Sequence, residues 1–132
     1  SDVGAADTAR ANIAANRGHF TGSKISSKAS DAEVFRIVAN SSGTITGLKT
    51  VINGALATAD AAIQFQLNGS DVGSTTTGLV TITQSGSAAG DVDTATPLTT
   101  NLAFVAGDVI SAVVEGGSTA TATFNFTVEY TY

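Results

Sequence analysis

The stretch TFNFTVEYTY, residues 123–132, decides the fold of this chain. Aromatic or branched side chains at positions 124, 126, 128, 130 and 132 alternate with polar ones. A period of two is typical of a strand with one buried face. Because the pattern runs to the last residue of the sequence, we expect this segment to be paired within a sheet.

A second alternating stretch, IQFQL at residues 63–67, is followed directly by Asn68-Gly69. Asn-Gly between two strands is the strongest short signal for a hairpin, so residues 70–73 should begin the return strand. The nearly continuous apolar run DVISAVVE at residues 108–115 predicts a central strand. Further strands are predicted over residues 33–39, 44–52, 79–83 and 101–104.

Turn residues separate these segments, and no helical period of useful length follows residue 30. Roughly seven or eight short strands at this spacing favour an all-β fold, a jelly-roll-like antiparallel β-sandwich. We assign this body to residues 31–132. The GDVD turn at residues 90–93 is predicted to lie in a loop.

The charges are distributed unevenly along the chain. All six Lys and Arg residues lie within residues 1–49, where four carboxylates leave a net charge of +2, whereas residues 50–132 carry −7. An acidic body repels phosphates, which argues against nucleic acid as a partner. The asymmetry indicates an attachment arm on an acidic body.

We assign the arm to residues 1–30, flexible or bound to a partner. Residues 5–15 have fair propensity for a short helix, but Ile13 is their only sizeable apolar side chain. No apolar run reaches the roughly 20 residues that span a bilayer, and the start lacks the apolar stretch of a signal peptide. The sequence therefore predicts no membrane partner and synthesis in a cytoplasm.

The residues that carry chemistry are few. The chain has no cysteine and one histidine, His19, which falls in the expected arm. Glycine motifs that hold phosphates are absent from the sequence. We therefore expect no catalytic activity and no cofactor.

One acidic pair, Asp91 and Asp93, is a weak candidate for calcium because carboxylate oxygens are the ligands that Ca²⁺ prefers. The pattern lacks the ladder of an EF-hand loop. The alternative is a solvated turn in which these side chains accept hydrogen bonds from neighbouring backbone amides.

Three stretches together resemble small virion structural proteins of tailed bacteriophages. They are GLKTVINGALATADAAIQFQLNGSDV (47–72), GLVTITQSGSAAGDVDTATP (78–97) and AGDVISAVVEGG (106–117). The resemblance covers about residues 43–132, and the QSGSAAGDVDTATP loop is its most distinctive part. It implies a jelly-roll-like β-sandwich that serves as a capsid decoration (cement) protein, a head fibre or another appendage.

The decoration role implies a major capsid protein as partner, a homotrimer, and a place on the capsid surface of the virion. It would stabilise the shell from outside. Within the expected arm, the predicted contacts with capsid or neighbouring subunits are Arg10, Arg17, His19, Phe20 and Lys24. The alternative is an adhesive module, either a head-fibre or tail-fibre tip or a carbohydrate-binding module, because a fold alone does not give a function.

Overall fold

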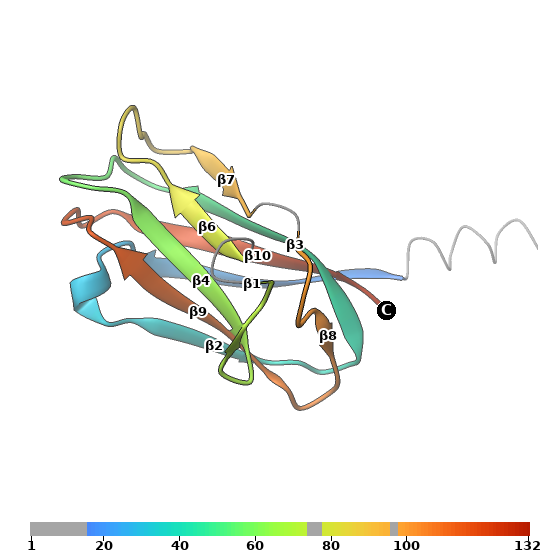
Figure 1. Cartoon of the computed structure of the whole chain (residues 1–132). Coiled ribbons are helices and arrows are strands. Elements are labelled where there is room, and N and C mark those ends of the chain that lie inside the picture. Colours follow the sequence, from blue (N-terminus) through green and yellow to red (C-terminus); the bar gives the residue numbers. More distant parts are fainter. Residues whose placement is uncertain (1–15, 74–77, 96–97) are drawn as a thin grey trace, which may run out of the picture.

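The computed structural model describes residues 16–73, 78–95 and 98–132, which form two antiparallel sheets packed face to face (Figure 1). A short 3₁₀ helix, η1 (Ala29–Asp31), connects β1 of one sheet with β2 of the other. Sheet A consists of β1 (Arg17–Ser26), β10 (Thr123–Thr131), β3 (Gly43–Ile52), β7 (Val92–Thr94) and β8 (Ala103–Phe104). Sheet B consists of β2 (Val34–Val38), β9 (Val109–Gly116), β4 (Ala61–Leu67), β5 (Ser70–Asp71) and β6 (Leu79–Ile82).

The strand order is that of a jelly roll. Sheet A runs β1-β10-β3-β7, and sheet B runs β2-β9-β4 with β5 and β6 both paired to β4. The chain alternates between the sheets from β1 to β4, stays in sheet B through β5 and β6, returns to sheet A for β7 and β8, and then crosses to sheet B for β9 and back for β10. Two such interlocked turns define the jelly roll, so the predicted fold is confirmed.

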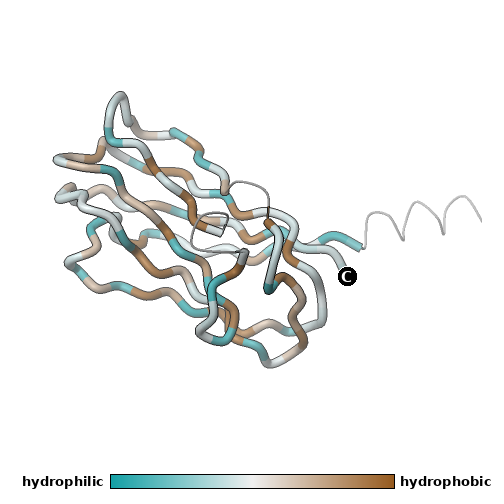
Figure 2. Tube along the Cα trace, viewed as in Figure 1, coloured by the Kyte–Doolittle hydropathy of each residue, from teal (hydrophilic) through white to brown (hydrophobic). Residues whose placement is uncertain are grey.

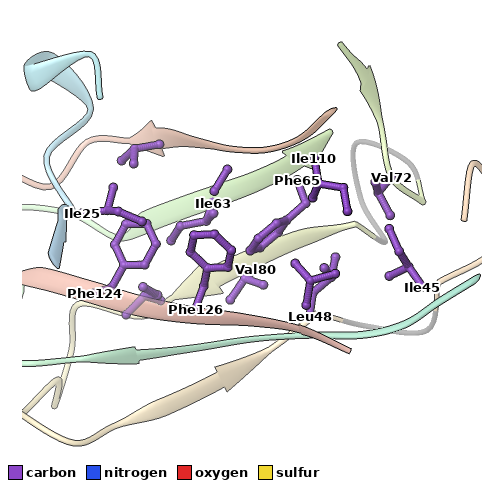
Figure 3. Close-up of a cluster of buried hydrophobic side chains, with 14 of the residues drawn as sticks. Ile25, Ile45, Leu48, Ile63, Phe65, Val72, Val80, Ile110, Phe124 and Phe126 are labelled. Carbon is purple, nitrogen blue, oxygen red and sulfur yellow. The ribbon is translucent and has the colours of Figure 1, made fainter. Parts of the chain in front are cut away.

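The core lies between the two sheets and is filled by alternate residues of their strands (Figure 2, Figure 3). Phe124 and Phe126 of β10 face Ile63 and Phe65 of β4, and the rings of Phe65 and Phe126 lie 5.2 Å apart. Each fully buried side chain of this size contributes about 1.5–3 kcal/mol. The alternation in residues 123–132 therefore fixes which side of sheet A faces inward.

The hairpin between β4 and β5 also follows the sequence. Asn68 and Gly69 both have positive φ, at 51° and 85°. That geometry suits the right-handed twist of the two strands and is why Asn-Gly is preferred there. The side-chain oxygen of Asn68 also accepts a hydrogen bond of 2.8 Å from the backbone N–H of Val109, which ties the turn to β9.

The expected boundary at residue 30 is wrong, because residues 17–26 form β1 at the edge of sheet A. The reason lies in two glycines. A Cβ at Gly18 would lie 2.4 Å from the Tyr130 ring, and one at Gly22 would lie 2.2 Å from the Phe126 ring. The rings of β10 fill the space that β1 leaves empty, so β1 belongs to the body. The helix expected over residues 5–15 lies outside the described residues.

Another correction concerns the segment after Asp91. Residues 92–94 form β7, which pairs with β3 through Val92–Val51, Asp93–Thr50 and Thr94–Lys49, whereas the sequence predicted a loop. Three residues are too few to show a period. Within the residues that the structure describes, no helix is long and apolar enough to span a bilayer.

Candidate interaction surface

The outer side of sheet A carries hydroxyls and a few charges over β1, β10 and the first half of β3, and an exposed Val92 beside Val51 at the β7 edge. Pairing places Arg17 beside Thr131, His19 beside Glu129 and Thr21 beside Thr127, all on the side opposite the core. We call this surface the threonine face. It consists of Arg17, His19, Thr21, Thr44, Thr46, Lys49, Thr127, Glu129 and Thr131.

A shallow groove of about 680 Å³ crosses the threonine face over β1, β10 and β3. Arg17 and His19 line it from β1, and Glu129 lines it from β10. Thr46 reaches it because the register between β3 and β10 shifts at this point, leaving Thr46 without a partner residue. Bulges of this kind commonly redirect a side chain toward a functional surface.

The charges on the threonine face are partly paired. The Lys49 ammonium lies 2.8 Å from a carboxylate oxygen of Glu129, and both side chains are nearly half exposed. Among the described residues, no carboxylate forms an ion pair with Arg17. The exposed Arg17 guanidinium therefore gives the face its net positive charge.

The outer side of sheet B has a different chemistry. The pairing of β2 with β9 places Val38 beside Val109 and Val34 beside Val113. Arg36 and Ser111 lie side by side between these two valine pairs. We call this surface the valine face, consisting of Val34, Arg36, Val38, Val109, Ser111 and Val113. Val38 is 64% exposed. Val34, Val109 and Val113 are partly buried, so the face has one exposed apolar side chain beside a group of half-buried ones.

Four aromatic rings gather at one end of the sandwich. Phe20 stacks on Tyr130 with ring centroids 4.8 Å apart, and Phe104 meets both of these rings edge-on. Tyr130 is buried, whereas Tyr132 is 56% exposed and lies against it at a tilt. The expectation that both tyrosines share a buried face therefore holds only for Tyr130.

The predicted contact residues fall in different places. Arg10 lies outside the described residues. Arg17 and His19 come together in the groove, whereas Phe20 points inward, half-buried against the aromatic cluster. Lys24 lies in an irregularity of β1 with a φ of 56°, and its backbone N–H donates to the side-chain oxygen of Asn125 at 2.9 Å.

The two residues of the weak calcium candidate lie in different settings, Asp91 in the turn before β7 and Asp93 within β7. A carboxylate oxygen of Asp91 accepts a hydrogen bond of 2.8 Å from the backbone N–H of Ala88, as the alternative interpretation predicted. Burial, and then the charge of Asp91, raises the pKa of Asp93. Within residues 16–73, 78–95 and 98–132, no group of three His, Asp or Glu side chains could hold a metal ion.

The sequence did not identify most of the groove. Thr46, Thr127 and Glu129 belong to strands that were predicted, but their meeting with β1 depends on a strand that was not. The signal was present in the alternation Gly18-x-Phe20-x-Gly22, which mirrors the bulky positions of β10. Small residues opposite large rings indicate that two strands pair. They cannot be recognised from the hydrophobicity of either strand taken alone.

Neither a known protein family nor a curated protein matches the sequence. Among solved structures, a chain of the acid-stable capsid of Helicobacter pylori bacteriophage KHP30 matches with a TM-score of 0.51 and 11% identity. The match covers 89% of this chain and 85% of that one. This likeness shows a shared fold, and it also shows that the two chains have similar lengths.

Two other structures match with lower scores. A chain of the cyanophage Pam1 capsid has a TM-score of 0.45 at 15% identity, covering 87% of this chain and 81% of its own. The carbohydrate-binding module CBM36, solved with calcium and xylotriose, has a TM-score of 0.38 at 18% identity, covering 86% and 87%.

Proposed function

We propose that this chain is a structural protein of a tailed-phage virion, and specifically a decoration protein of the head. It would bind the outer surface of the shell and stabilise it without catalysis. The observation that carries the proposal is a complete jelly roll of nearly the same length as a chain of a phage capsid. The resemblance of three sequence stretches to small phage virion proteins supports it independently.

In this proposal the partner is the major capsid protein, and the decoration protein assembles as a homotrimer. The valine face supports assembly, because neighbouring copies would remove Val38 and the half-buried valines beside it from water. The chain before Asn16 adds further contact with the shell, and Arg10 is its basic residue. The resulting location is the outside of the virion.

The first experiment is immunogold labelling of purified virions with an antibody against residues 31–132. Dense label over whole heads is the expected result. Label confined to the tail tip or to a few head sites would move the protein to an appendage. The absence of label on intact particles would refute the virion assignment.

A deletion then tests the leading segment. Removing residues 1–28 would also remove β1 and expose the rings of Phe126 and Tyr130, so a loss of binding would have no single cause. Removing residues 1–15 leaves every described strand in place. If this shorter chain binds heads with undiminished affinity, the leading segment makes no contact with the shell.

A second candidate is an adhesive module that binds a glycan. Tyr132 favours it, because its exposed ring borders a groove of about 380 Å³ together with Ser42, Thr44 and Phe104. Aromatic rings with a few polar groups are a common lining of small-molecule sites. Glycan binding on an array that disappears with Tyr132→Ala, while head binding is absent, would favour this candidate.

A further inference from the structure

We infer that the threonine face docks onto an acidic protein surface and that Arg17 makes the principal charged contact. The inference deepens the proposed function, since it rests on a shell or another virion protein being the partner. It assigns the docking face and the chemistry of the surface that covers it.

The first argument is the contrast in charge between this face and the rest of the described body. The threonine face carries the cations Arg17 and Lys49 and one carboxylate, Glu129, for a net charge of +1. The other described side chains include three cations and eight carboxylates, for −5. Taken as a whole, the rest of the described body would repel an acidic surface while the threonine face attracts it, so charge favours an encounter through this face.

The second argument is which cation remains available. The Lys49 ammonium forms an ion pair with a carboxylate oxygen of Glu129 at 2.8 Å. Arg17 is exposed at the rim of the groove, beside Thr131 on the neighbouring strand. A guanidinium presents a planar fork that binds a carboxylate through two hydrogen bonds, which gives orientation as well as attraction.

The third argument is the rigidity of the surface around Arg17. Thr21, Thr46 and Thr127 are β-branched, so their side chains have few rotamers to lose on binding. Their hydroxyls can donate to carboxylates and accept from backbone amides of a partner. Within the part of the chain that the structure describes, a rigid surface rich in hydroxyls thus surrounds one cation that has no carboxylate partner.

The same pattern disfavours a nucleic acid on this face. A phosphate backbone is held by several cations that follow its charge spacing, whereas the threonine face offers one unpaired cation among the described residues. Separate carboxylates on a folded protein match this arrangement better. A neutral glycan or a second copy of the chain are outcomes that the experiment distinguishes.

The test compares two charge reversals, Arg17→Glu on the threonine face and Lys28→Glu beside η1, outside both the threonine face and the valine face. Neither side chain belongs to the core, so thermal unfolding should show both variants folded. Co-sedimentation with heads that lack the protein should show Arg17→Glu binding at least 10-fold more weakly. Lys28→Glu should stay within about twofold of the wild type, and added salt should weaken the wild type toward Arg17→Glu.

Failure of the proposed function and failure of this inference give different results. If the wild-type chain does not bind heads, the proposed function fails, and the inference is then tested with a deca-glutamate peptide. NMR shifts of Thr21 and Thr127 amides that vanish in Arg17→Glu would support it, and shifts elsewhere would overturn it.

If heads bind wild type and Arg17→Glu equally, the inference is wrong while the proposed function stands. A change only in self-association would assign the face to a second copy, and binding of a neutral glycan there would also overturn it.

Discussion

The two outer faces of this sandwich are built alike and differ in chemistry. On the threonine face the outward positions of β10 include Thr127 and Glu129, whereas on the valine face the outward positions of β9 include Val109, Ser111 and Val113. Both faces cover the same core through the same alternation. The difference between them is therefore not required by the fold.

Threonine and valine make the contrast informative because they have nearly the same shape. Both are β-branched and suit an extended backbone, and they differ by a hydroxyl in place of a methyl group. An outward strand position accepts either one with little effect on packing. In the proposed function, a polar partner lies against the threonine face and neighbouring copies lie against the valine face, which would account for the choice between the two side chains.

The largest expected effect tests whether the threonine face is a continuous surface. Gly22→Ala places a methyl group 2.2 Å from the Phe126 ring, which is itself 3% exposed and packed against Phe35 and Phe65. Overpacking of this kind costs about 1–3 kcal/mol. Denaturant unfolding should show that loss, whereas Thr21→Ala next to it should change stability by under about 0.5 kcal/mol. Equal stability of the two variants would mean that β1 is not integral to sheet A.

A somewhat smaller effect is expected at the end of sheet B. Asn68→Ala removes the hydrogen bond to Val109 and places alanine at a φ of 51°. The combined loss should be about 1–2 kcal/mol, because both the bond and the left-handed backbone favour asparagine. Ser70→Ala, at an exposed position of the same hairpin, is the control. A loss in the control as large as in Asn68→Ala would refute the role of the Asn68 side chain.

The ion pair on the threonine face should contribute less. A double-mutant cycle with Lys49→Ala and Glu129→Ala should give a coupling of about 0.2–1 kcal/mol, because both side chains are partly exposed to solvent. The coupling should shrink in 1 M salt. A coupling that salt leaves unchanged would indicate a contact other than an ion pair.

The smallest effect concerns pH at the free edge of sheet A. The raised pKa of Asp93 means that the folded protein holds this proton more tightly than the unfolded chain does. Its contribution to stability is full below the ordinary value of 3.8 and is lost as the pH rises through the raised pKa. Asp93→Asn should therefore melt slightly higher than the wild type at neutral pH.

Melting temperatures at pH 3 and pH 7 check this sign. The gap between Asp93→Asn and the wild type should close in acid, where the wild-type carboxyl is protonated. Glu115→Gln, at an exposed position of β9, controls for a general loss of negative charge. A wild type more stable than Asp93→Asn at neutral pH would contradict the expectation.

Much of the fold could be predicted from the sequence because most strands have side chains on their inner positions. The strands containing Phe124, Phe65 and Ile110 all show their buried faces as alternation or as continuous apolar runs. β1 shows neither, since two of its inner positions are glycines whose space is filled by rings from β10. The small residues of β1 are complementary to the large rings of β10. This complementarity can be recognised only when β10 is known to be the partner strand.

The candidate site could be predicted only in part for the same reason. Arg17 and His19 stood out as part of a basic leading segment, and the structure brings both to one groove. Phe20 belongs to the aromatic packing instead, since alternation along β1 turns it inward. The threonines of β3 and β10 could not be distinguished from the many others in the sequence until pairing gathered them on one face.

The hydrogen bond from the backbone N–H of Tyr132 to the carbonyl of Asn16 has a mechanical consequence. The two residues lie at the same end of the antiparallel pair β1–β10 (Figure 1). A load pulling them apart acts across the strands and breaks their hydrogen bonds one after another, beginning with this bond and continuing at the pair Arg17 and Thr131. The sandwich should thus yield at low force when stretched between these points, and resist best when a load is spread over its flat faces.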